Sequence, residues 1–351
     1  MVKLQTDARV RACVSGSGAD PTNSKLAVRT HALGALTNRQ AARPGARLAV
    51  AASAICMSDY FDITHSSHYR YAQPVLLGEH RVLYRPRGSH DMRVLATDLN
   101  ITPPPASVRL IQDVYSNSVA LVQPQSPADE LRVLCTFTVE HMGIQASAFP
   151  LLPAVETYPF TYDAEDQVAL MHYLTPFYDD PQQRLHNWAT GFVAQGANTG
   201  TRELLLAMTQ YIRDSMQYLI RADEGVQTPH ETLTMNSGSC RDFATLMIEA
   251  VRQLGYAARF VSGYLYAPAL DVDPAQATGS GTTHAWLEVY LPGAGWLPFD
   301  PTNNLVDGTS LIRVAVARHA SRASPISGSW EGAPADYLGL TVDVQVHKRN
   351  Q

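Results

Sequence analysis

The chain has 351 residues, with 27 Lys or Arg, 32 Asp or Glu, a formal net charge of −5 and an apolar fraction of 45%. This length allows two domains with cores of their own. Because no apolar run approaches the roughly 20 residues that cross a bilayer, we expect a soluble, cytoplasmic protein without a membrane partner. The cysteines, Cys13, Cys56, Cys135 and Cys240, are too few and too scattered for a disulfide scaffold.

The first 56 residues differ in composition from the rest. They contain eight Lys or Arg, two Asp or Glu and no aromatic residue. Such a segment cannot bury enough apolar surface to fold alone. Residues 1–57 are therefore predicted to be disordered or a non-native extension, and a chain starting at Met57 is expected to be as stable as the full one. The arginine-rich composition also suits a transit peptide, whereas scattered charges disfavour nucleic-acid binding.

Short alternating runs separated by Pro, Gly and Asn dominate residues 58–145, for example FDITHSSHYRY and RVLCTFTVEHM. This pattern predicts an antiparallel β-rich domain, similar to a sandwich. His65 and His68 would point to opposite faces of a strand, which disfavours a shared metal, and residues 271–274 lack the spacing of a calcium loop. We expect neither a metal nor another cofactor.

The Pro-rich residues 146–162 are predicted to form a linker to a core over 163–315. Asp180 and Pro181 are a predicted N-cap and first-turn pair ahead of QQRLHNWATGFVAQ. The next run, TRELLLAMTQYIRDSMQYL, carries apolar residues at helical spacing: Leu205, Met208, Ile212 and Leu219. Strands followed by helices predict an α+β fold.

A cysteine stands at the predicted start of a further helix. Loop-type residues end at Ser239, and after Cys240 apolar residues recur at helical spacing as far as Leu254, with Gly255 at the C-terminal cap. The unpaired N–H groups and the dipole at a helix N-terminus favour a thiolate and can bind an oxyanion. A buried structural cysteine is the alternative, and would be preferred for a cysteine without partners.

A histidine and an aspartate follow on two predicted strands, 284–291 and 296–300, joined by a Pro-Gly turn. With a plain four-residue loop, Asp300 would lie opposite Leu287, on the wrong face for contact with His284. A one-residue shift, from a longer loop or a bulge, places Asp300 opposite Trp286 and diagonal to His284. A site that combines Cys240, His284 and Asp300 therefore requires this shift.

Further residues are predicted near this site. Trp286 and Tyr264 are expected to line a substrate groove, with Ser239 beside the nucleophile; packing in the strand core is the alternative for the two aromatic residues. The stretch APALDVDPAQATGSGTT leads directly into His284. It is predicted to be a surface connection, with a substrate-gating flap as the alternative.

Two segments, NSGSCRDFATLMIEAVRQLGYAARFVSGYLY and THAWLEVYLPGAGWLPFDPTNN, resemble the transglutaminase-like core, a superfamily of papain-like cysteine enzymes. Upstream, FDITHSSHYRYAQPVLLGEHRVLYRPR and LIQDVYSNSVALV resemble the β-rich N-terminal region that accompanies this core in bacterial proteins. The usual DxxGN turn has Ser116 in place of glycine here. By this resemblance, Cys240 matches the nucleophile, His284 the base and Asp300 the orienting acid.

The resemblance implies acyl transfer from a protein or peptide amide through a thioester on cysteine, with an amine or water as acceptor. The chain would then be a transglutaminase, protease, amidase or deamidase. A non-catalytic transglutaminase-like binding module and a structural scaffold are the alternatives. All three matched residues are present, which favours the enzyme. The C-terminal residues 316–351 are predicted to be loop-like, with LTVDVQVHK as a candidate closing strand.

Overall fold

The computed structural model of the chain describes residues 58–143, 150–195, 198–221, 225–266, 283–306 and 308–349. The predicted N-terminal extension lies outside these ranges, as do residues 271–274 and all but the last residue of the predicted surface connection that leads into His284. Within the described ranges, no helix combines the length and the apolar character that a membrane span requires.

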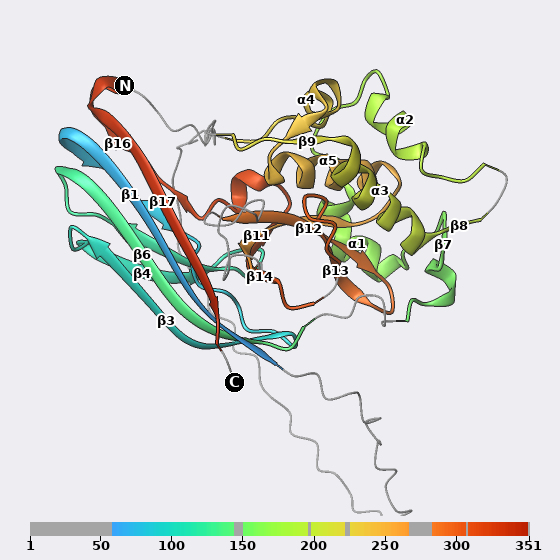
Figure 1. Cartoon of the computed structure of the whole chain (residues 1–351), viewed down its shortest axis with the longest axis horizontal. Helices are drawn as coiled ribbons and strands as arrows, with labels where there is room; N and C mark the ends of the chain where they lie inside the picture. Colours follow the sequence, from blue (N-terminus) through green and yellow to red (C-terminus); the bar gives the residue numbers. More distant parts are fainter. Residues whose placement is uncertain are drawn as a thin grey trace, which may run out of the picture. The chain divides into compact units, whose positions relative to one another are not determined.

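Two antiparallel sheets build the N-terminal region, as predicted (Figure 1). The first has the order β16-β1-β6-β3, with β17 also paired to β1: β1 (Asp59–Leu77), β3 (Met92–Thr102), β6 (Ala128–His141), β16 (Trp330–Glu331) and β17 (Tyr337–Lys348). The second has the order β15-β2-β5-β4: β2 (His80–Val82), β4 (Ser107–Gln112), β5 (Ser118–Gln123) and β15 (Ile326–Ser327). Buried residues of both sheets, such as Leu131 and Val133 of β6 and Val122 of β5, share one apolar cluster.

The C-terminal residues return to these two sheets. The predicted closing strand is confirmed as β17, which pairs with β1 from Phe61–Lys348 to Tyr71–Tyr337. The ring of Trp330 in β16 also lies 5.2 Å from the ring of Tyr71. The β-rich region is therefore discontinuous in sequence, since its first sheet is completed by residues from the other end of the chain.

The core combines a third antiparallel sheet with helices. The sheet has the order β13-β12-β11-β14: β11 (Ala258–Leu265), β12 (His284–Leu291), β13 (Gly295–Phe299) and β14 (Leu311–Ala317). The helices are α1 (Ala164–Leu174), α2 (Arg184–Thr190), α3 (Thr201–Ser215), α4 (Pro229–Met235) and α5 (Cys240–Gln253). Apolar residues of α5, such as Phe243 and Met247, share a buried cluster with Ala285, Leu287 and Val289 of β12. The alternation expected for β12 thus turns one face of the strand toward the helix.

Short elements complete the core. The two-residue strands pair as β7 (Thr157–Tyr158) with β8 (Thr199–Gly200) and as β9 (Gln217–Tyr218) with β10 (Ser237–Gly238). The described residues also include three single-turn 3₁₀ helices, Pro153–Val155, Ala320–Arg322 and Pro334–Asp336, the last of which lies against β1.

The predicted linker is more than a connection. Leu151, Val155 and Tyr162 are buried. The hydroxyl of Tyr162 accepts the N–H of Ala257 at 2.9 Å and donates to the carbonyl of Tyr290 at 2.8 Å. The proline content of this segment suggested a linker. The aromatic and aliphatic residues between the prolines instead pack onto the core and bury apolar surface.

Two helix boundaries differ from the prediction. Helix α2 begins at Arg184, so Asp180 is not its N-cap; its carboxylate instead accepts the N–H of His186 in the first turn, at 2.9 Å. Helix α3 ends at Ser215, which leaves Leu219 beyond it. Helices α1 and α4 were not predicted individually. Short helices depend on tertiary packing, which local patterns report poorly.

A side-chain cap joins the β-rich region to the core sheet. The Asp113 carboxylate accepts the N–H groups of Tyr115 and Asn117, and Ser116 takes φ +64° where the family pattern has glycine. The Asn117 amide then donates to the carbonyl of Val316 at 2.7 Å and accepts its N–H at 2.9 Å. The serine therefore keeps the turn, and Asn117 pairs with the backbone of β14 as a strand would.

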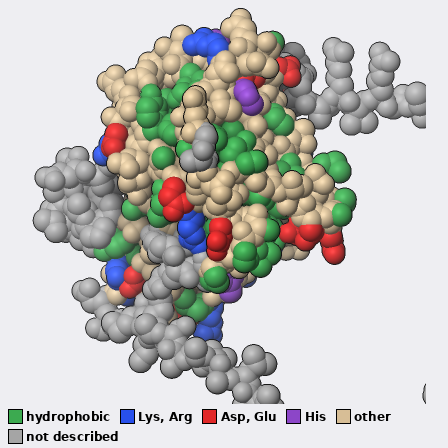
Figure 2. Space-filling view, turned by 90° about the vertical axis from the view of Figure 1, so that its right-hand side faces the viewer, with side chains coloured by type: hydrophobic (Ala, Val, Ile, Leu, Met, Phe, Trp, Pro, Cys, Tyr) green, Lys and Arg blue, Asp and Glu red, His purple; other side chains and the backbone are tan. Residues whose placement is uncertain are grey.

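One side of the molecule shows how surface charge is distributed. The face that lies to the right in Figure 1 has apolar side chains scattered over it, with separate acidic and basic groups between them (Figure 2). This visible face has no single dominant charge.

Candidate active site

Helix α5 presents Cys240 at its first residue, as predicted. The helix starts there because Ser239 and Asp242 form a capping arrangement: the Asp242 carboxylate accepts both the N–H and the hydroxyl of Ser239, each at 2.8 Å. The Cys240 side chain is only 7% exposed. The nucleophile candidate thus lies at a helix N-terminus, where N–H groups favour negative charge.

The same carboxylate ties the start of α5 to the preceding loop. Arg221 donates to both oxygens of Asp242, at 2.9 and 2.8 Å, and the N–H of Gln227 donates at 2.7 Å. Burial opposes the charge on Asp242, but Arg221 and the backbone donors outweigh burial and lower its pKa. A charged Asp242 is therefore stable in the interior and fixes the position of Cys240.

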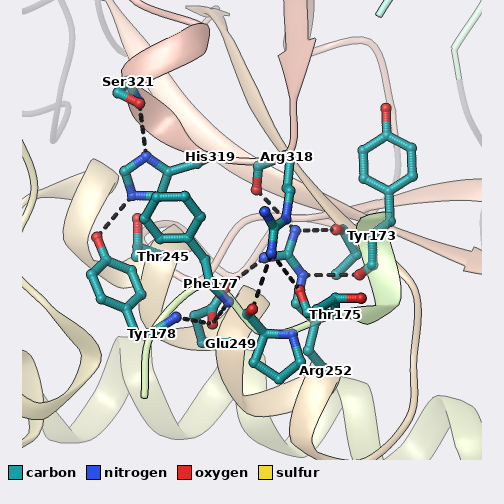
Figure 3. A network of polar contacts seen from close by, with 12 residues as sticks. Tyr173, Thr175, Phe177, Tyr178, Thr245, Glu249, Arg252, Arg318, His319 and Ser321 are labelled. Carbon is teal, nitrogen blue, oxygen red and sulfur yellow. Dashed lines mark hydrogen bonds and ion pairs between the residues drawn. The ribbon is translucent and has the colours of Figure 1, made fainter. Parts of the chain in front are cut away.

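The other end of α5 is also anchored by a buried charge pair (Figure 3). Glu249 and Arg252 form an ion pair at 2.5 Å, and Glu249 accepts the N–H groups of Phe177 and Tyr178 at 2.7 and 3.2 Å. Arg252 in turn donates to the carbonyl of Tyr173 at 2.9 Å. Buried polar contacts therefore hold both ends of α5.

His284 and Asp300 are in direct contact. His284 Nε2 lies 2.8 Å from Asp300 Oδ2, and both side chains are fully buried. The predicted one-residue shift is confirmed, since Leu287 pairs with Phe299, which brings Asp300 opposite Trp286. A shorter loop causes the shift, whereas the sequence suggested a longer loop or a bulge.

The hairpin turn explains the register. Only residues 292–294 separate the strands, with Gly295 already paired to Leu291. The N–H of Ala294 donates to the carbonyl of Leu291 at 2.9 Å, and Gly293 has φ +96°, as the third position of a Pro-Gly turn requires. Gly295 follows with φ +78°, a conformation that few other residues adopt. This Pro-Gly-Ala-Gly sequence therefore sets which residue of β12 lies opposite Asp300.

Further donors hold Asp300. Its Oδ1 accepts the N–H of Thr302 at 2.9 Å, and its Oδ2 accepts the side-chain amide of Asn303 at 2.9 Å. Burial raises the pKa of this carboxyl, but His284, Asn303 and Thr302 outweigh burial and lower it. Asp300 is therefore charged and oriented toward the imidazole.

The protonation of His284 follows from its partners. Burial lowers the pKa of His284, but the charge and hydrogen bond of Asp300, together with the Cys240 thiol, raise it to about 10. Its Nδ1 has no hydrogen-bond partner among the described residues. The ring thus binds Asp300 through Nε2, and Cys240 lies near enough to raise the pKa of the same imidazole.

The predicted substrate-binding residues have different surroundings. Trp286 is 1% exposed, and its ring stacks on His284 at a centroid distance of 5.9 Å, so it backs the imidazole. Tyr264 is buried against the β-rich region, where its hydroxyl bonds His65 Nδ1 at 2.8 Å. Ser239 uses its hydroxyl in the cap of α5. These contacts favour supporting roles over the predicted contact with substrate.

The sequence reasoning missed two residues of this region. Asn303 donates to Asp300, and its amide lies 3.3 Å from His284 Nε2. Tyr218 pairs with Gly238 across β9 and β10, two residues before Cys240. Burial, and then the nearby Cys240 and Asp300, raise the pKa of Tyr218 to about 12. The polar residues after Asp300 were a signal for the first; nothing local indicated the second.

Within the described residues, no group of three or more His, Cys, Asp or Glu side chains is placed to hold a metal ion. The polar groups around Cys240 instead pair with one another. His284 is paired with Asp300, and Asp242 is paired with Arg221. The arrangement is suited to moving a proton between a thiol and an imidazole.

Comparisons with known proteins identify the family of this chain. Residues 187–301 match the transglutaminase-like superfamily, and residues 61–140 match the bacterial transglutaminase-like N-terminal region. Two uncharacterised mycobacterial proteins, ML0607 of Mycobacterium leprae and Rv2569c of Mycobacterium tuberculosis, are each 26% identical to the chain. The matches cover 80% of this chain and 97% of ML0607, and 81% of this chain and 92% of Rv2569c.

Among solved structures, a candidate cysteine protease from Cytophaga hutchinsonii is similar in fold. Its TM-score is 0.62 at 21% identity, and the match covers 84% of this chain and 92% of that protein. The chain thus consists of a transglutaminase-like superfamily core with a bacterial transglutaminase-like N-terminal region.

Proposed function

We propose that the chain is a cysteine-dependent enzyme that transfers or hydrolyses the acyl group of a protein or peptide amide. The observation that carries this proposal is the 2.8 Å contact of His284 with Asp300, in a site where Cys240 lies near enough to raise the pKa of the same imidazole. A nucleophile, a base and a residue that orients the base are the three parts of this chemistry.

In the proposed mechanism, Cys240 and His284 rest as a thiolate and a protonated imidazole, and Asp300 holds the ring at Nε2. The thiolate attacks the amide carbonyl, and N–H groups at the start of α5 bind the oxyanion, which is worth roughly 3–4 kcal/mol per donor in comparable sites. His284 then donates its proton to the leaving amine or ammonia. A thioester on Cys240 remains, and an amine or water releases it.

A screen that follows three products from one substrate tests this function. Casein, a glutamine-containing protein, is incubated with the enzyme and a fluorescent primary amine, and ammonia release, amine incorporation and new N-termini are measured. Ammonia with amine incorporation indicates a transglutaminase, ammonia alone a deamidase and new N-termini a protease. A protein that forms no product, and no acyl-enzyme detectable by intact mass on casein or on a panel of reactive esters, contradicts the proposal.

A further inference from the structure

A groove of about 640 Å³ opens in the β-rich region, and neither Cys240, His284 nor Asp300 lines it. It is lined by β3 and β4, which stand at the ends of their two sheets, and by the loop that contains Arg85 and Arg87. This volume suits a peptide segment of several residues.

One wall of the groove is the edge strand β4. Within the described chain this strand pairs only with β5, and all six of its residues, Ser107–Gln112, are exposed. The N–H of Asp113 donates to the carbonyl of Asn117 just beyond the strand. Because antiparallel ladders alternate, the backbone groups of Val108, Leu110 and Gln112 point away from β5. These outward groups are a template for another strand.

The side chains of β4 do not protect this edge. Leu110 and Ile111 line the groove and are 61% and 44% exposed. The single charged residue of the strand, Arg109, is paired with Glu79 at 2.9 Å. Natural edge strands usually carry free charges, prolines or bulges that discourage pairing, and β4 has an apolar edge instead.

The charge of the groove is one-sided. Arg85, Arg87 and Arg93 line it, and no lining residue carries a carboxylate. Among the described residues, Arg85 and Arg87 form no ion pair, while Arg93 lies 3.6 Å from Glu140. Two unpaired guanidinium groups beside an apolar strand edge complement a partner that is acidic and extended.

We propose that this groove binds an extended acidic peptide segment, which adds a strand to β4 and places carboxylates against Arg85 and Arg87. Backbone hydrogen bonds to Val108, Leu110 and Gln112 supply affinity, and alternate side chains meet Leu110, Ile111 and the arginines. This surface goes beyond the proposed acyl chemistry and does not depend on it.

Fluorescence polarisation with the full-length chain tests the proposal. The probe is a capped, labelled heptapeptide of alternating Glu and Val. We expect saturable binding that weakens at least about tenfold when Arg85→Glu and Arg87→Glu are combined. The pair Arg70→Glu and Arg132→Glu is the matched control, because it changes the net charge equally at exposed positions outside the groove; it should leave affinity within about twofold.

Backbone pairing is tested separately. Leu110→Pro removes an outward N–H but leaves the bonds to β5, so it should weaken binding on the order of tenfold. A heptapeptide N-methylated at alternate residues lacks the N–H groups that would pair with β4. It should bind the wild-type chain as weakly as the unmodified probe binds Leu110→Pro, and this test does not depend on the folding of a variant. Equal binding of a Lys/Val peptide, complete displacement by inorganic phosphate or polyuridylate, or a dimer of the chain that Leu110→Pro dissociates would each overturn the proposal.

Discussion

The two cysteines of the described chain have nearly the same burial and very different surroundings. Cys135 lies in β6, 2% exposed, within the apolar cluster of the β-rich region. Burial, with Asp98 nearby, raises the pKa of its thiol to about 12. Cys240 is 7% exposed, but it lies at the start of α5 beside His284. Exposure does not separate the two residues; the helix end and the imidazole do.

The largest expected effect comes from exchanging each cysteine in turn. Cys240→Ala should reduce turnover on the order of 10⁶-fold, as loss of the nucleophile does in comparable enzymes. Cys135→Ala should leave turnover unchanged and lower the free energy of unfolding by about 1–3 kcal/mol, because it leaves a small cavity. Turnover and chemical denaturation measure the two effects. Turnover that persists in Cys240→Ala, or that falls equally in both variants, would show that Cys240 is not the catalytic cysteine.

The carboxylates beside the two cysteines give the next comparison. Asp300→Asn should lower turnover by about 10⁴-fold, because the imidazole loses the acceptor that fixes its tautomer. Asp98→Asn, which changes the exposed carboxylate near Cys135, is the matched control and should have no effect on turnover. Unchanged turnover in Asp300→Asn would show that the contact with His284 does not serve the chemistry.

A smaller effect is expected at Asn303. Asn303→Ala removes one donor to the charged Asp300 and should lower turnover about 10–100-fold, the equivalent of a hydrogen bond to an ion. Thr302→Ala retains the backbone N–H that Asp300 accepts and should behave as wild type. Steady-state kinetics of Asn303→Ala and Thr302→Ala measure the two effects. Equal losses of turnover in both variants would argue against a specific role for Asn303.

The pH dependence of turnover reports on His284. Its pKa, about 10 in the folded chain, is above the ordinary value of 6.5. The folded state therefore binds the proton of His284 more tightly than the unfolded state does, and this difference stabilises the fold. The stabilisation is complete below pH 6.5 and is lost as the pH rises through 10. Because the ring must donate a proton to the leaving group, turnover should decline near pH 10 in wild type. In Asp300→Asn this alkaline decline of turnover should move toward pH 6.5. A decline at the same pH in wild type and Asp300→Asn would show that it does not report the titration of His284.

The sequence could predict the parts of this molecule that depend on local patterns. The α+β fold, the start of α5 at Cys240 and the alternation of β12 all follow from periodicity and capping signals. The contact of His284 with Asp300 required a register that the sequence allowed but did not fix. The length of the hairpin loop decided it, and that length depends on the backbone conformations of Gly293 and Gly295.

Other features were outside the reach of local patterns. The pairing of β17 with β1 joins segments roughly 280 residues apart, and periodicity reports no partner. Tyr264 was predicted to meet substrate because it is aromatic and near the site in sequence. Its hydroxyl instead bonds His65 of the β-rich region, a contact that only the tertiary arrangement creates.

Activation of Cys240 by His284 is tested most directly by the alkylation rate of Cys240 at pH 6, measured by peptide mass spectrometry after timed exposure to iodoacetamide. We expect rapid labelling of Cys240 in wild type, labelling at least about 100-fold slower in His284→Ala, and negligible labelling of Cys135 in both. Equal rates for Cys240 in wild type and His284→Ala would show that the imidazole contributes nothing to the reactivity of the thiol, and would exclude His284 as its base.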